Sequence, residues 1–176
     1  MKKTNIALVF AFLIILSVGA ATAFGWGIRF RFYFGLLPYE RSKSVSVEAS
    51  DLKGGYVVRP ISDLYQLKFM NFIASVTKGE EGEVILEGKH PDVCSLMNRT
   101  TPRFHMGWGW VNTTKIRIFE TKYDVWYLQM WVRDEALYLN MRYRSDEHVI
   151  EKLFLIDDPG LAAEAHDLML EAFFEG

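Results

Sequence analysis

The sequence predicts an α+β domain in which an antiparallel β-meander is packed on one face by helices, preceded by an N-terminal transmembrane helix. Three observations support this fold class. A run of 25 uncharged residues occupies positions 4–28, residues 108–144 alternate in polarity as strands do, and residues 157–176 have the apolar spacing of an amphipathic helix. The predicted divisions are a membrane segment with an aromatic belt (1–34), a linker (35–43) and a single folded domain (44–176).

The N-terminal segment has the length of a membrane span. No residue between Thr4 and Ile28 is charged, and about 20 apolar residues in a helix cross a bilayer. The same segment has a basic start and a small-x-small motif ending at Ala23, so cleavage as a signal peptide is the alternative. Aromatic residues and arginines follow directly, as at a membrane interface, and they favour retention as a single-pass signal-anchor.

The side of the membrane on which the domain lies is predicted from two opposing signals. More basic residues follow the apolar run than precede it, which favours a cytoplasmic domain. The signal-like layout of the first 23 residues favours export. The prediction is an extracytoplasmic domain attached to the bilayer through residues 4–28.

The first half of the domain contains short strands around one helix. Residues 44–50 alternate with period two and predict a strand, and residues 56–58 continue as a second short strand after a glycine-rich turn. Residues 60–79 carry apolar side chains at helical spacing, and a glycine ends this helix, although residues 65–69 also alternate and leave a strand there as the alternative. Residues 83–88 predict another strand, and residues 89–107 are expected to form a long loop.

The strongest structural signal is a hairpin centred on Asp134 and Glu135. Two alternating strands flank this pair, and taking the pair as a two-residue turn sets the register. The predicted core face then pairs Val132 with Leu137, Met130 with Leu139, Leu128 with Met141 and Trp126 with Tyr143.

A second hairpin precedes the first and shares its central strand. A three-residue loop, Glu120–Lys122, is predicted here because it places Ile116 beside Trp126 on the same apolar face. After the meander, residues 148–156 fit either a fourth strand or a short helix. The chain ends in a helix that is capped by Asp158 and has a proline at its first position.

Composition and motif searches exclude several function classes. The net charge of −2 argues against a nucleic-acid binder that works by bulk electrostatics. Cys94 is the only cysteine, so an internal disulfide and a cysteine-based zinc cluster are excluded. The sequence has no phosphate-binding glycine loop and no hydrolase or metalloprotease motif. No cofactor and no metal are predicted.

The candidate binding surface is the polar side of the meander, which we call the cationic–aromatic face. The predicted register stacks Lys115, Tyr127 and Arg142 in one row, and the neighbouring rows contain no acidic residue. Aromatic rings beside amides and guanidinium groups can stack on ring-shaped ligands, pair with anions or bind a partner protein. The residues assigned to this face are Lys115, Tyr127, Gln129, Trp131, Tyr138, Asn140 and Arg142.

These observations predict a membrane-tethered, non-enzymatic domain that binds a partner protein or an anionic or glycan ligand through the cationic–aromatic face. One alternative is a secreted hydrolase or transferase that uses the loop from His90 to His105, with Cys94 between them. Another alternative is a lipid carrier with a cavity between the sheet and its helices. A flat exposed surface at Trp131 and Tyr127 would favour binding, and a closed apolar cavity would favour the carrier.

Overall fold

The computed structural model describes residues 42, 44–50, 55–78, 82–89, 91–97, 102–108 and 113–176. Residues 41–176 form one compact unit, separate from residues 1–40. Within the described residues, no helix is long and apolar enough to cross a membrane. The predicted transmembrane segment and most of the linker lie outside the described residues.

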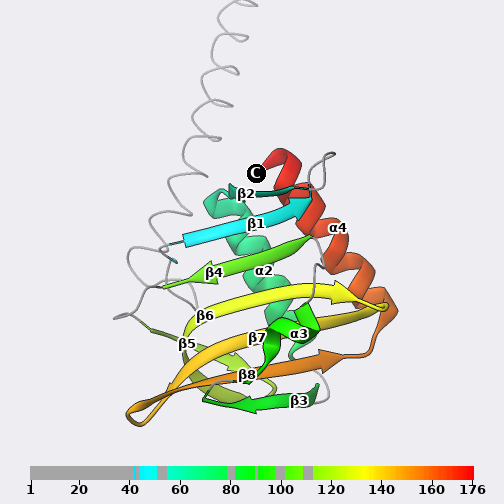
Figure 1. The fold of residues 1–176 in the computed structure, drawn as a ribbon. Helices are drawn as coiled ribbons and strands as arrows, with labels where there is room; N and C mark the ends of the chain where they lie inside the picture. Colours follow the sequence, from blue (N-terminus) through cyan, green and yellow to red (C-terminus); the bar gives the residue numbers. More distant parts are fainter. Residues whose placement is uncertain are drawn as a thin grey trace, which may run out of the picture. The chain divides into compact units, whose positions relative to one another are not determined.

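The described elements follow one another in an order typical of an α+β fold (Figure 1). The first half contains β1 (Ser44–Ser50), β2 (Tyr56–Pro60), α2 (Asp63–Val76), β3 (Glu83–Gly88), α3 (Val93–Met97) and β4 (Arg103–Gly107). The second half contains β5 (Thr114–Ile118), β6 (Thr121–Arg133), β7 (Ala136–Ser145), β8 (His148–Ile156) and α4 (Pro159–Glu175). The segment that fits both a strand and a short helix is therefore a strand, β8.

All described strands belong to one antiparallel sheet with the order β2-β1-β4-β6-β7-β8-β3. Strand β6 is long enough to pair with two strands along the same edge. Its first part pairs with β5, and its second part pairs with β4. Strand β4 therefore lies between β1 and β6, and it connects the strands at the start of the domain to the meander from β5 to β8 within one sheet.

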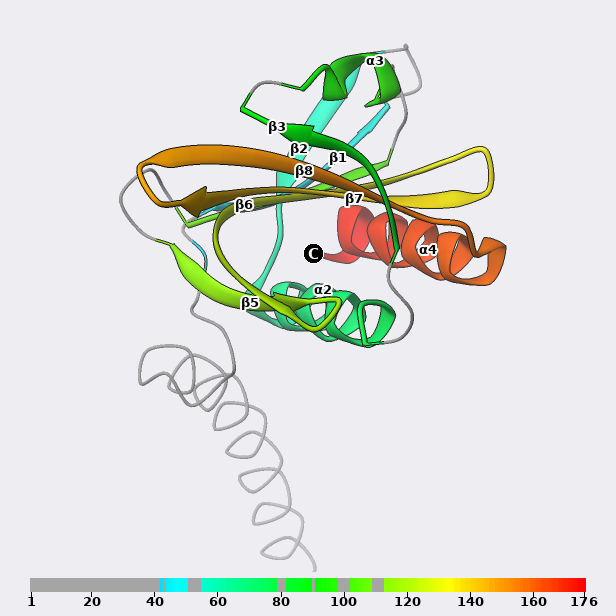
Figure 2. The same ribbon diagram turned by 90° about the horizontal axis from the view of Figure 1, so that it is seen from below.

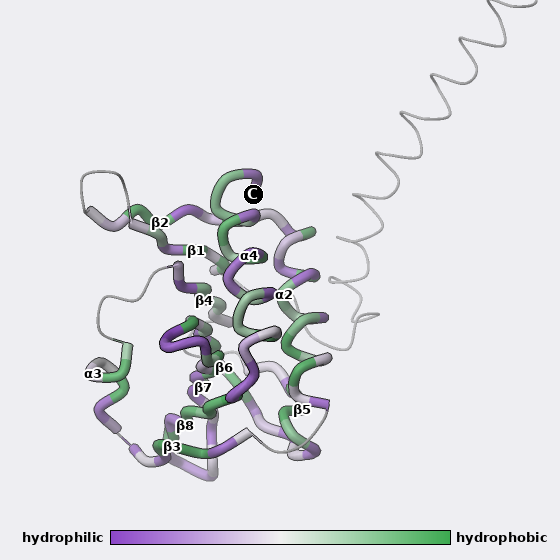
Figure 3. Tube along the Cα trace, turned by 90° about the vertical axis from the view of Figure 1, so that its right-hand side faces the viewer, coloured by the Kyte–Doolittle hydropathy of each residue, from purple (hydrophilic) through white to green (hydrophobic). Residues whose placement is uncertain are grey.

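Helices α2 and α4 cover one face of the sheet, and α3 lies over the other (Figures 2 and 3). The core between the sheet and the two long helices is filled by side chains that are almost completely buried. The ring of Phe69 on α2 stacks on Phe104 of β4 with 3.9 Å between centroids. Alternation along β6 and β7 directs Leu128, Met130 and Leu139 into the same layer.

The prediction for the last helix is confirmed at its start. The side chain of Asp158 accepts hydrogen bonds from the backbone N–H groups of Gly160 and Leu161, and Pro159 occupies the first turn. These contacts satisfy amides that a helix otherwise leaves unpaired. Ala165 and Met169 lie on the buried stripe that packs against the sheet.

The register of the central hairpin is confirmed for most of its length. Leu128 pairs with Met141, and the pairs between it and the turn follow the prediction. The pairing of Trp126 with Tyr143 was wrong, because β6 has a bulge between Val125 and Tyr127, so that Val125 lies opposite Tyr143. A bulge adds one residue to one strand and shifts every pair beyond it.

The predicted three-residue loop between β5 and β6 was also wrong. The turn consists of Phe119 and Glu120, whose φ angles of 44° and 65° are those of a tight two-residue hairpin turn. Ile116 therefore lies opposite Tyr123 instead of Trp126. Phe119 is held in this conformation by tertiary contacts, since its N–H donates to the Thr77 carbonyl at 3.1 Å and its ring packs in the core.

Residues 89–107 do not form the long loop that was predicted. This segment contains α3 and β4, and β4 lies between β1 and β6 in the sheet. Figure 2 shows the two predicted helices, α2 and α4, on one side of the sheet, whereas α3, which was not predicted, lies on the other side.

Candidate functional site

The sheet face opposite α2 and α4 carries the polar side of every central strand. Because successive side chains on a strand alternate, burial of Leu128 and Met130 against the helices turns Tyr127, Gln129 and Trp131 to the other face. Each of these three residues has a direct partner on β7. The pairs are Tyr127 with Arg142, Gln129 with Asn140 and Trp131 with Tyr138, as predicted.

Trp131 is not on an exposed surface. Its side chain is completely buried in a small cluster with Val93 of α3 and Leu153 of β8. Its ring is stacked on the half-buried Tyr138, with centroids 5.4 Å apart and planes 8° apart. The expectation of a flat exposed surface at this residue is wrong, because α3 covers this part of the face.

Gln129 and Asn140 are buried beside this cluster. The Gln129 side-chain amide donates to the sulfur of Met97 on α3 at 2.8 Å. The Asn140 amide donates to the Glu151 carboxylate at 2.7 Å. Gln129 therefore attaches the covering helix α3 to the sheet, and Asn140 holds the Glu151 carboxylate in its buried position. Because both side chains are buried, neither is placed to contact a large ligand directly.

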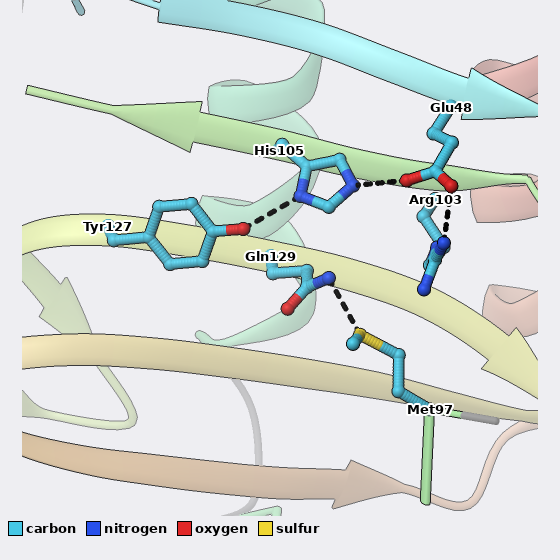
Figure 4. Close-up of polar contacts among 6 residues, drawn as sticks. All are labelled: Glu48, Met97, Arg103, His105, Tyr127 and Gln129. Atoms are coloured by element: carbon cyan, nitrogen blue, oxygen red, sulfur yellow. Dashed lines mark hydrogen bonds and ion pairs between the residues drawn. The ribbon is translucent and has the colours of Figure 1, made fainter. Parts of the chain in front are cut away.

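A polar cluster of Glu48, Arg103, His105 and Tyr127 occupies the part of the face nearer to β1 (Figure 4). His105 on β4 lies between two strands, with its Nδ1 atom 2.7 Å from the Tyr127 hydroxyl and its Nε2 atom 3.4 Å from a Glu48 oxygen. The second contact has the length of an ion pair and is too long for a strong hydrogen bond. The other Glu48 oxygen accepts a hydrogen bond from the Arg103 guanidinium.

Partial burial decides the protonation of this cluster. Burial lowers the pKa of His105 from its usual value, an effect opposed by the negative charge of Glu48 and reinforced by the positive charge of Arg103. Burial raises the pKa of the Tyr127 hydroxyl, although the nearby Arg142 charge opposes this shift. Near neutral pH, the cluster thus holds a neutral phenol and a largely neutral imidazole beside a carboxylate–guanidinium pair.

The cationic groups of the face are paired with acids that the sequence prediction did not place there. The Nε atom of Arg142 lies 3.0 Å from a Glu151 oxygen, and its guanidinium lies 5.4 Å from the centroid of the Tyr127 ring. Glu48 pairs in the same way with Arg103. The expectation of rows without acids was wrong, because β1 and β8 add one carboxylate on each side.

Lys115 does not belong to the row in which the prediction placed it. The two-residue turn at the start of β6 sets Lys115 opposite Asp124, so β5 does not reach Tyr127. The strand beside Tyr127, Gln129 and Trp131 is β4, which contributes Gly107, His105 and Arg103 to the three rows. Lys115 itself is exposed.

Three cluster residues, Glu48, Arg103 and His105, were missed as members of this face. The signal was present in the segment that runs from Arg103 to Gly107, where Arg103 and His105 alternate with the buried Phe104 and Met106. Glu48 alternates in the same way with Val47 and Ala49 on a strand that was correctly predicted. These residues come together because β4 pairs with both β1 and β6, and no local sequence pattern specifies those two pairings.

The loop that the enzyme alternative requires is not formed as expected. His105 belongs to β4, whereas His90 and the Cys94 side chain lie outside the described residues. Among the residues that the structure describes, no three His, Cys, Asp or Glu side chains are grouped so that they could hold a metal ion.

The space between the sheet and the long helices does not favour the lipid-carrier alternative. Phe69, Met70 and Ile73 of α2 fill that space against the sheet and are almost completely buried. A shallow groove of about 790 Å³ lies between α2 and α4, where Lys68 and Glu171 form an ion pair at 2.7 Å. The groove is open to solvent, and its lining mixes charged side chains such as Glu164 and Asp167 with apolar ones such as Phe72 and Leu168, so it is not a closed apolar cavity.

Comparisons of the chain with protein-family models, with curated proteins and with solved structures gave no match.

Proposed function

We propose that this chain is a membrane-tethered, non-enzymatic domain that binds a partner protein through the polar cluster and the adjacent Arg142. The observation that carries the proposal is the contrast between the two sheet faces. One face packs against α2 and α4 and supplies the hydrophobic core. The other presents a half-buried phenol, an imidazole and two guanidinium groups, which the core does not require for its packing.

The charges of this face favour a protein over a free anion. Each guanidinium already has a carboxylate partner, so the face has balanced charge and offers no strong attraction to a phosphate or sulfate. Tyrosine and arginine are enriched where protein interfaces concentrate their binding energy. Glycan stacking is less favoured, because the ring of Trp131 is buried beneath α3.

The arrangement around His105 gives less support to an enzyme. A general base needs a ring nitrogen within reach of the substrate proton. Here Nδ1 is hydrogen-bonded to Tyr127 and Nε2 faces Glu48, so both ring nitrogens are directed at the protein itself. The imidazole therefore orients the Tyr127 hydroxyl, which remains as a polar group for recognition.

The membrane tether is supported by the sequence alone. The uncharged run of residues 4–28 followed by aromatic and basic residues is the basis for this part of the proposal. Attachment to a bilayer would confine the domain to the vicinity of other membrane components.

Site-specific photo-crosslinking of the full chain in cells of its source organism tests the proposal. A photoreactive phenylalanine replaces Arg144, which is exposed and lies two residues from Arg142 on the same face of β7, and a matched control carries it at Glu164, which is exposed on α4 on the opposite side of the domain. We expect a discrete adduct with another protein from position 144 only. Truncation of a hot-spot residue costs about 2 kcal/mol or more, so adding Arg103→Ala should weaken binding roughly thirtyfold and remove the adduct. Equal adducts from both positions, or none from position 144, would refute the proposal.

A further inference from the structure

Exposed apolar side chains gather at the β2 end of the domain. Of the six large hydrophobic side chains that are exposed in the described part of the chain, four lie there, namely Tyr56, Val58, Leu64 and Phe174. Leu64 lies in the first turn of α2, four residues after the end of β2, and Phe174 follows Phe173, whose carbonyl accepts a hydrogen bond from Arg59 of β2. Val58 is 60% exposed and Phe174 is 71% exposed. Two of the four, Tyr56 and Val58, lie on β2 itself and on the same face, and exposed apolar side chains that are grouped on one strand mark an interaction surface more often than scattered ones do.

Strand β2 is an edge strand whose outer backbone groups can be identified. The N–H of Ile61 donates to the Val45 carbonyl at 3.2 Å, so the backbone of Ile61 faces β1. Because backbone groups alternate in direction along a strand, those of Arg59 and Val57 also face β1. The backbone groups of Tyr56, Val58 and Pro60 therefore point away from the sheet, and β2 has no other strand partner among the described residues.

We propose that two copies of this chain pair through β2, antiparallel and about a two-fold axis that passes beside Val58. In this register the two Val58 residues exchange both of their backbone hydrogen bonds. Each Tyr56 N–H also donates to the Pro60 carbonyl of the other copy. The missing N–H of Pro60 removes one bond at each end, so it limits the pairing to this short segment instead of preventing it.

The side chains along this edge are compatible with their own copies. On the face of the polar cluster, Val58 meets Val58 and Tyr56 meets Pro60, and all of these are apolar. On the helix face, Val57 meets Arg59. The Arg59 guanidinium is engaged within its own copy by the Phe173 carbonyl at 3.0 Å and by the Phe173 ring. No like charges face each other, as a self-complementary two-fold interface requires.

The opposite edge of the sheet lacks these properties. Strand β3 carries Glu83 and Glu87, and its pairing with β8 has an irregularity between Val84 and Leu86. Charges and bulges at an edge are features that prevent strands from pairing with other molecules. Strand β5, which pairs only with β6 in the described part of the chain, is a further edge and carries the exposed Lys115 and Arg117. Both other edge strands thus carry pairs of exposed charges, whereas β2 carries only Arg59, which favours a closed dimer over an extended array.

Disulfide trapping of the full chain in detergent micelles tests the pairing. In a Cys94→Ser background, Val58→Cys places two thiols on hydrogen-bonded partners whose Cα atoms are about 5.5 Å apart, within the range that a disulfide spans. Val84→Cys on β3 is the matched control, since both valines are exposed on edge strands of one sheet. We expect a covalent dimer from Val58→Cys and none from Val84→Cys. Association through residues 4–28 alone would crosslink both variants or neither, and either outcome overturns the proposal.

A second measurement does not depend on thiol chemistry. Sedimentation velocity of the full chain in detergent should give a dimer at micromolar concentration. Val58→Lys sets two like charges beside the axis and should give a monomer, whereas Val84→Lys should remain dimeric. A wild-type monomer, or a Val58→Lys dimer, would show that β2 is not the contact.

Discussion

Replacement of Trp131 by alanine should destabilise the domain strongly, although the sequence suggested an exposed binding residue. The side chain is completely buried against Val93 and Leu153 and is stacked on Tyr138. Truncation of a buried tryptophan costs about 3–5 kcal/mol, because apolar burial is lost and a cavity remains. The Trp131 Nε1 atom is buried without a hydrogen-bond partner in the described part of the chain. Truncation also removes this unfavourable buried group, which reduces the net destabilisation. We therefore expect Trp131→Ala to lower the free energy of unfolding by about 3 kcal/mol.

Urea denaturation of residues 41–176, followed by far-ultraviolet circular dichroism, measures this change. The matched control is Arg144→Ala on the same face of β7, whose side chain is exposed and whose loss should change the free energy of unfolding by about 0.5 kcal/mol or less. A loss below about 1 kcal/mol for Trp131→Ala would mean that α3 does not cover the ring. Equal losses for both variants would also contradict the packing described above.

Three further predictions concern the rest of the molecule. Leu128→Ala should cost about 2–5 kcal/mol in a denaturation experiment, because this side chain is completely buried between the sheet and the helices. Asp158→Ala should cost about 0.5–2 kcal/mol in the same experiment, since it removes the acceptor of two amides at the start of α4. The free energy of unfolding should fall as the pH falls through about 6.5, because burial lowers the pKa of His105 and the unfolded chain then binds more protons; His105→Gln should flatten this slope in a pH series.

The sequence was sufficient to predict the register where a local signal existed. The alternation on both sides of Asp134 and Glu135 determined the pairing from Leu128 to the turn, and the structure confirms it. The hairpin before it lacked such a signal, since neither Phe119 nor Glu120 is a residue that favours a positive φ. Contacts of Phe119 with distant parts of the chain determine that turn, and these cannot be read from a local pattern.

The candidate site was predicted only in part for a related reason. The pairs that Tyr127, Gln129 and Trp131 make with β7 follow from one hairpin, so they were predicted correctly. Their neighbours on the other side belong to β4, which is separated from β6 by the whole of β5. A pairing between strands that are not consecutive depends on the complete fold. The position of His105 in the site could therefore not be predicted without the order of the strands in the sheet.

The placement of α3 has a consequence for how this domain can vary. Helix α3 belongs to the connection between β3 and β4, and its residues Val93 and Met97 rest on the face that carries the polar cluster. The side chains that hold α2 and α4 lie on the reverse of the same strands. Insertions or substitutions in this one connection would enlarge, reduce or reshape the footprint offered to a partner, while the main hydrophobic layer keeps its composition. Recognition and folding thus use opposite faces of the same strands, so a library that varies the exposed positions of the β3–β4 connection while keeping Val93 and Met97 can search for new specificities without removing the packing on Trp131.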